Sequence, residues 1–205
     1  MKVGDIVKRV REYLDEVNAL NNVEVLNGSA PVDERIMSLI PECAVVFGQG
    51  KAMDVSSFAV GNGGVGLIDV PADYGRLQEL RLSCWSRSVY EVVLPGTPQY
   101  RRQQNLVTRG GTVRPVVALV PKGEGRVLEL YSVPTWDSRV KVDEASYVAV
   151  PVIEDRDTDI AVSSDKESAM CYMIAVRVAR TYGDETSATL LSSTLNEEMS
   201  IKSVM

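Results

Sequence analysis

The feature that most constrains the fold is a run near the C-terminus that is apolar on almost every side of a helix. At helical spacing it contains Ala169, Met170, Met173, Ile174, Val176, Val178 and Ala179. A helix that is apolar nearly all round has to be covered by other elements, so this run predicts a central helix. Ser164 and Glu167 have the spacing of a capping box at its start, and Gly183 is expected to cap its end.

The N-terminal segment predicts an amphipathic helix, whose apolar residues are Val3, Ile6, Val7, Val10, Leu14 and Val17. A second helix is expected to begin at Pro31, because proline and the following Asp33 and Glu34 all suit a first helical turn. Pro41 either ends this second helix or kinks it. At the other end of the chain, Asp184 predicts the cap of a final helix.

β patterns occupy the middle of the chain, at 76–83, 89–94, 114–120, 127–133 and 147–153. The leucines of 76–83 do not alternate strictly, so a bulge is expected there. Residues 55–60 and 65–70 flank a glycine-rich turn and predict one hairpin, and the loop 122–125 predicts another. Pro151 suggests that the last strand lies at a sheet edge.

These patterns predict an α+β fold in which the N- and C-terminal helices form a bundle, with a central antiparallel β region inserted between them. The expected boundaries are 1–50 for the N-terminal helices, 51–160 for the β region, and 161–205 for the C-terminal helices and tail. The whole is expected to be one domain with a β insertion.

Composition excludes several kinds of chemistry. The 205 residues contain no histidine, which rules out histidine-activated nucleophiles and removes the commonest metal ligand. A formal net charge of −6 argues against a general nucleic-acid-binding surface. Cys43, Cys84 and Cys171 are odd in number and far apart, so buried free thiols are expected. No run has membrane-spanning length and no signal peptide is evident, so a cytoplasmic site of synthesis is expected.

Two motifs suggest chemistry that their surroundings do not support. Residues 61–66 match GxGxxG, but a β-like segment and Pro71 follow where a dinucleotide site needs a helix. Asp155, Asp157 and Asp159 alternate as in a calcium loop, yet the glycine and glutamate of that pattern are missing. We therefore expect a flexible hairpin and a solvated loop, and no cofactor or metal site.

Two groups of residues are candidates for a protein interface. The first comprises Trp85, Arg87, Tyr100, Arg101 and Arg102. Such residues can also stack on bases and contact phosphates, but in an acidic chain we favour a protein interface, where these residue types are enriched. The second comprises Met199, Ile201 and Val204, in a tail (196–205) expected to be mobile in the free subunit and ordered against a neighbouring chain.

A set of residues in the central stretch also suggests a family. In order, these are Pro71, Arg76-Leu77, Trp85, Tyr100, Gln104-Asn105, Gly110-Gly111 and Arg114-Pro115-Val116. Their order and rough spacing resemble the ring-forming head-to-tail connector proteins of crAss-like bacteriophages, which are relatives of podovirus tail adaptors. The resemblance extends weakly over most of the chain and depends on many ordinary residues rather than on one diagnostic motif.

The resemblance implies a structural protein of the virion, assembled in the cytoplasm of the host bacterium, and not an enzyme. It implies a homo-oligomeric ring, a dodecamer, that contacts the portal protein on one side and other connector or tail proteins on the other. DNA would pass through the lumen without specific binding, and no catalytic residue, cofactor or membrane is involved. The alternative is a cytoplasmic enzyme or ligand-binding domain that uses the loop at 61–66.

Overall fold

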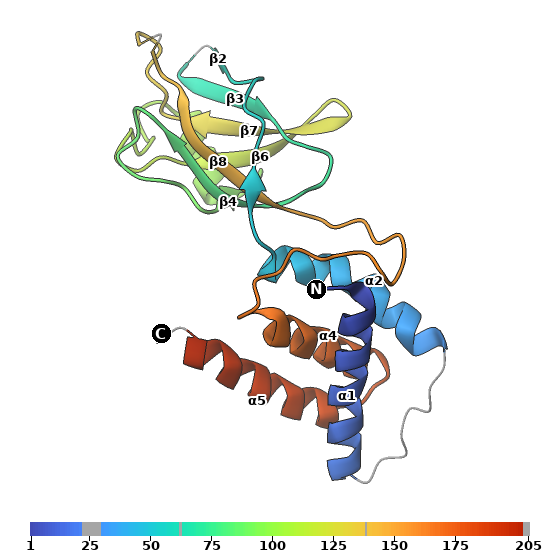
Figure 1. Cartoon of the computed structure of the whole chain (residues 1–205). Coiled ribbons are helices and arrows are strands. Elements are labelled where there is room, and N and C mark those ends of the chain that lie inside the picture. Colours follow the sequence, from blue (N-terminus) through green and yellow to red (C-terminus); the bar gives the residue numbers. More distant parts are fainter. Residues whose placement is uncertain (22–29, 62, 138, 203–205) are drawn as a thin grey trace. The chain divides into compact units, whose positions relative to one another are not determined.

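The computed structural model describes residues 1–21, 30–61, 63–137 and 139–202, and these form two compact units (Figure 1). The helical unit consists of Met1–Gln49 and Val150–Met205, and the β unit consists of Gly50–Ala149. Each unit has its own hydrophobic core. The mixed α+β class is as predicted, with helices at both ends of the chain and strands between them.

The helical unit is built from four helices, namely α1 (Val3–Asn21), α2 (Ala30–Phe47), α4 (Glu167–Thr181) and α5 (Glu185–Lys202). Helix α4 contains the nearly all-apolar run and packs against each of the other three. The N- and C-terminal helices therefore form one bundle, as predicted, with Leu14 and Ile174 in its shared core (Figure 1). Pro41 does not end α2, which continues to Phe47. No helix among the described residues is both long and apolar enough to cross a membrane.

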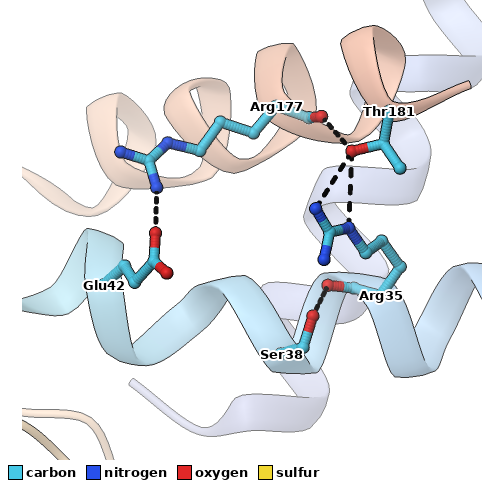
Figure 2. A network of polar contacts seen from close by, with 5 residues as sticks. All are labelled: Arg35, Ser38, Glu42, Arg177 and Thr181. Atoms are coloured by element: carbon cyan, nitrogen blue, oxygen red, sulfur yellow. Dashed lines mark hydrogen bonds and ion pairs between the residues drawn. The ribbon is translucent and has the colours of Figure 1, made fainter. Parts of the chain in front are cut away.

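Polar side chains join α2 to α4 along the surface of the bundle (Figure 2). Arg177 forms an ion pair of 2.5 Å with Glu42, and the Arg35 guanidinium donates to the hydroxyl of Thr181 at 3.2 and 3.4 Å. Thr181 in turn donates to the carbonyl of Arg177, and Ser38 to that of Arg35. Exposed contacts of this kind add little free energy, so the buried apolar residues supply most of the bundle's stability.

The helix ends agree with two predictions and contradict a third. Gly183 has φ +78° directly after α4, and the Asp184 carboxylate accepts a hydrogen bond of 2.9 Å from the Ser187 amide at the start of α5. The prediction of a capping box is wrong. Helix α4 begins at Glu167, its N-cap is Lys166, and no side chain forms a capping hydrogen bond. Glu167 thus stands at the first helical position, too early to fold back onto Ser164.

Residues 150–160 belong to the helical unit and not to the β region, whose end was placed at 160. The Val3 amide donates to the Thr158 carbonyl at 3.0 Å, and the Ile160 amide donates to the Met1 carbonyl at 2.8 Å. These hydrogen bonds hold the returning chain against the N-terminus of α1.

The β unit contains two sheets. One has the strand order β1-β8-β4, where β1 is Lys51–Ala52, β8 is Val142–Ala149 and β4 is Tyr74–Leu82. The other has the order β2-β3-β7-β6-β5. Its strands are β2 (Ala59–Gly61), β3 (Val65–Asp69), β5 (Val92–Val93), β6 (Val117–Lys122) and β7 (Gly125–Tyr131). All pairs are antiparallel except β5–β6, which is parallel.

Both predicted hairpins form, since β2 pairs with β3 and β6 pairs with β7. The irregularity expected in the 76–83 segment is also present, because the register of β4 against β8 shifts at three places. The prediction that 147–153 forms an edge strand is wrong. Strand β8 ends at Ala149 and is hydrogen-bonded on both sides, and Pro151 lies beyond it, where no partner strand needs its missing N–H.

Candidate interaction surface of the β unit

A short helix, α3 (Pro98–Gln104), begins the most distinctive surface of the β unit. The Thr97 hydroxyl accepts a hydrogen bond of 3.2 Å from the Tyr100 amide, and Pro98 occupies the first helical position. No helix is predicted over 97–108 in the sequence. The Thr-Pro pair is the signal that could have revealed this helix, because it combines an N-cap residue with a proline suited to the first turn.

A polar network holds α3 against strand β7. The Tyr131 hydroxyl donates to Glu129 Oε2 at 2.5 Å and accepts a hydrogen bond of 2.7 Å from Gln104 Nε2. The Tyr100 hydroxyl donates to the same carboxylate at 3.4 Å, and its ring meets that of Tyr131 edge to face. Burial and the neighbouring Glu129 carboxylate raise the pKa of Tyr131, so its hydroxyl stays protonated and can donate.

Arg109 ties the turn after α3 to two other parts of the unit. Its Nε donates to the Gln103 carbonyl at 2.6 Å, and Nη1 donates to the Gly63 carbonyl in the β2–β3 turn. The guanidinium also lies over the Tyr131 ring, 5.1 Å from its centre. Arg109 therefore fixes α3, the β2–β3 turn and the end of β7 relative to one another.

The backbone beside Arg109 needs unusual conformations. Gly64 has φ +68°, and a Cβ there would lie 2.6 Å from the Val133 carbonyl oxygen. Ser132 has φ +64°, the one positive φ among the described residues that are not glycine. Such conformations are strained for an L-residue and persist where the surroundings impose them.

These segments surround a shallow hollow of about 380 Å³, which we call the Trp136 hollow. Its lining comprises Gly63, Gly64, Leu106, Arg109, Gly111, Ser132, Val133, Pro134, Thr135 and Trp136. Most of the lining is apolar, and Trp136 is 82% exposed. Leu106 in this lining is also strongly exposed, as are Val107 and Val113 in the same stretch of chain. A cluster of exposed large apolar side chains that includes tryptophan is typical of a protein interface.

Three exposed arginines accompany the hollow in the same stretch of chain. Arg101 and Arg102 lie on α3, and Arg114 follows the turn that contains Gly111. The Arg102 carbonyl accepts the Thr108 hydroxyl at 2.6 Å, and the Arg114 amide donates to the Gly110 carbonyl at 3.2 Å, so both backbones border this turn. In the part of the chain that the structure describes, none of these three guanidinium groups has a hydrogen bond or an ion pair. Their charge is available to an acidic partner.

The first group of predicted interface residues is split by the structure. Trp85 is only 3% exposed and lies in the core of the β unit, so its place on an interface was wrong. Its apolar ring belongs to the same buried cluster as Leu80 and Leu82. Arg87 lines a different hollow, together with Tyr90 and Pro115. Trp136, which the sequence analysis did not select, is the exposed tryptophan of the chain.

The second group lies in or beyond α5. Residues 196–202 continue α5. Met199 is 50% exposed on α5. The side chain of Ile201 and all of Val204 lie outside what the structure describes. A role for these residues against a neighbouring chain stays a prediction.

The GxGxxG segment lies in a β hairpin, as predicted, and the acidic loop contains an ion pair. Gly61 ends β2, Gly63 and Gly64 lie in the turn before β3, and Val65 begins β3, which leads to strand β4 and not to a helix. Asp157 of the acidic loop is paired with Lys2 at 3.1 Å. Among the described residues, no three acidic or thiol side chains gather in a way that could hold a metal ion.

Charge is unevenly divided between the two units. The helical unit contains 10 Lys and Arg against 18 Asp and Glu, whereas the β unit contains 12 against 10. The net charges are therefore −8 and +2, which together give the −6 of the chain. One chain thus presents an acidic unit and a slightly basic one.

Comparison with protein-family models gives no match, and comparison with curated proteins gives none either.

Proposed function

We propose that the chain is a structural subunit of a bacteriophage head-to-tail connector, and that copies of it form a dodecameric ring between the portal and the tail. The observation that supports this proposal best is the Trp136 hollow with its exposed arginines. A ring needs two different, complementary patches on each subunit, since its contacts run head to tail. The β unit offers the apolar hollow and three exposed arginines in the same stretch of chain, and the helical unit has the opposite net charge.

The composition of the patch favours a protein partner over a small molecule. Trp and Arg are among the residue types that most often anchor protein interfaces. The hollow is shallow and open, whereas ligand pockets usually enclose most of their ligand. Arg109 contacts Gln103, Gly63 and Tyr131, and these contacts hold the segments around the hollow together before a partner binds. Such preorganisation lowers the entropy cost of association.

Light scattering on the purified protein over a range of concentrations tests the ring. We expect a twelve-subunit mass at high concentration or in the presence of the portal protein, and ring-shaped particles by electron microscopy. A mass of one subunit under all these conditions would reject the proposal. Replacement of Trp136 by serine should weaken assembly by about tenfold or more, as loss of an interface anchor does. Exposed Tyr90→Ser, at the other hollow, is the matched control.

The lumen of the proposed ring should be acidic or neutral, since a basic lumen would retain the DNA phosphates. The helical unit, at −8, provides enough acidic surface for such a lining. The assembled protein should therefore bind duplex DNA weakly at low salt. Tight binding that weakens steeply with salt would contradict this expectation.

A further inference from the structure

The chain passes from one unit to the other at two places, after Gln49 and after Ala149. Each unit holds its own part of the chain with hydrogen bonds up to a definite residue on either side of these crossings. The residues left between those points decide how freely the backbone can turn there.

The helical unit holds the chain as far as Gln49. The Gln49 amide donates to the Ala161 carbonyl at 3.0 Å, and its side-chain Nε2 donates to the Ser163 hydroxyl at 3.2 Å. Gly48, one residue earlier, pairs with Val162 in an isolated antiparallel bridge. The backbone on this side of the first crossing is therefore fixed to the helical unit.

The β unit holds the chain again from Lys51. This residue pairs with Tyr147 of strand β8, and its ammonium lies 5.1 Å from the centre of the Tyr147 ring. Lys51 Nζ also forms an ion pair of 2.6 Å with Asp73, whose carboxylate accepts a hydrogen bond of 2.8 Å from the Tyr147 hydroxyl. Both the backbone and the side chain of Lys51 are thus fixed to the β unit.

Gly50 is the single residue between these two fixed points. In the part of the chain that the structure describes, it forms no hydrogen bond. Glycine has access to more backbone angles than any other residue, so rotation at Gly50 costs little energy. An added Cβ there would overlap the side-chain amide of Gln78, so a larger residue does not fit in this conformation.

The second crossing contains a segment of three residues, 150–152. Strand β8 ends at Ala149, and the first hydrogen bond of the returning chain is the one that the Glu154 amide donates at 3.3 Å. Among the described residues, 150–152 form no hydrogen bond. Val152 is 74% exposed, so packing does not hold the segment either. Pro151 has a fixed φ, which leaves rotation to the residues around it.

We propose that Gly50 and residues 150–152 form a hinge about which the two units turn, each as a rigid body. In hinges of this kind a few residues at the ends of elements absorb the backbone rotation. A partner that binds the β unit then selects one orientation from those that the hinge allows. The inference goes beyond the proposed function and does not depend on it.

Distances between spin labels, measured by pulsed electron paramagnetic resonance on the full chain, test the hinge below the concentration at which the chain assembles. All variants have Cys84→Ser, because the other two cysteines are buried. The labelled pairs use exposed sites, namely Glu34→Cys with Lys122→Cys across the units, Glu34→Cys with Thr189→Cys in the helical unit, and Arg81→Cys with Lys122→Cys in the β unit. The distance distribution across the units should be at least about twice as wide as either distribution within a unit.

Stiffer connections should narrow the distribution across the units. Gly50→Ala removes backbone angles that are open to glycine, and Val152→Pro fixes a second φ. Gln78→Ala accompanies both changes and serves alone as the reference, since the Gln78 side chain would overlap the new Cβ. Gly61→Ala is the matched control, because a Cβ there meets only the Val65 carbonyl oxygen, at 3.5 Å, and it should leave the width unchanged. Unchanged distances within each unit show that a variant is folded.

The remaining outcomes overturn the inference or separate it from the proposed ring. A distribution across the units as narrow as those within them would show one rigid body. A wide distribution within either unit, or a width that the stiffened variant does not reduce, would also overturn the hinge. A ring of twelve subunits built from a rigid chain would reject the hinge while the proposed function survives. A chain with the wide distribution that never assembles would reject the ring and support the hinge.

Discussion

Gly64 shows how one residue sets the shape of the candidate surface. Its φ is +68°, and a Cβ added at this position would lie 2.6 Å from the Val133 carbonyl oxygen. Any side chain here would therefore destabilise the fold. Gly64→Ala should lower the free energy of unfolding of the β unit by ~3 kcal/mol or more, because strain and a backbone clash add. Urea unfolding followed by tryptophan fluorescence measures this change.

Gly63→Ala is the matched control. Gly63 also has a positive φ, at +77°, but a Cβ there meets nothing within 4 Å. Strain alone should cost about 1–2 kcal/mol at this position. Equal losses for the two variants would show that the Val133 carbonyl can move aside, and that the turn is less rigid than described.

The cysteines differ in their surroundings and should differ in reactivity. Cys43 and Cys171 are fully buried, and burial raises their pKa to about 11 and about 12, whereas Cys84 is half-buried. At pH 8 an aromatic disulfide reagent should therefore modify Cys84 first, and the other two thiols only after unfolding. Reaction of all three at one rate in the native protein would contradict the burial.

The same shifts predict how stability depends on alkaline pH. The folded pKa values of Cys43 and Cys171 lie above the unfolded value of about 8.5–9. Folding therefore keeps both groups protonated, and their contribution is complete below pH 9. It should be lost progressively as pH rises from about 9 to 12. Cys171→Ala should reduce the part of the loss that occurs in this range, which urea unfolding at pH 8 and pH 11 measures.

At the scale of elements, the bundle depends on buried contacts between the two ends of the chain. Leu14 on α1 is buried in the core that α4 shares. Leu14→Ala should lower the free energy of unfolding by about 2–5 kcal/mol, as truncation of a buried leucine does. Hydrogen exchange of the amides in 170–179 should become faster, since α4 would lose a packing partner.

Asp15→Ala is the control for this substitution. Asp15 is exposed on the same helix, one residue away, and should change stability by less than about 0.5 kcal/mol. Full protection of 170–179 in the Leu14 variant would show that α1 does not support α4.

At the scale of the whole molecule, the β unit should fold without the helices. It is one continuous segment, Gly50–Ala149, and every residue of its core lies within that segment. The excised fragment should unfold cooperatively and protect the amides of β4 and β7 from hydrogen exchange. Leu80→Ala in the fragment, at a fully buried site, should destabilise it strongly. An unfolded fragment would mean that the helical unit is needed to complete the β unit.

Local patterns in the sequence determined most of the helical unit. The apolar run at Met170–Ala179 predicted a helix buried on several sides, and α4 packs against three other helices. The glycine turns and the alternating residues around them were enough to place both hairpins. Each of these features is decided within a few residues, by backbone freedom or by the period of the side chains.

Only the tertiary structure decided which side chains face a partner. Trp85 and Trp136 both lie in polar surroundings in the sequence, yet the first is in the core and the second is 82% exposed. Arg109 holds together segments that are 46 residues apart, which no local pattern shows. The sequence thus determined most of the elements, because those depend on neighbours in the chain, and the apolar stripes of the terminal helices indicated that they pack together. The candidate surface depends on which distant segments meet, and packing between them decided that.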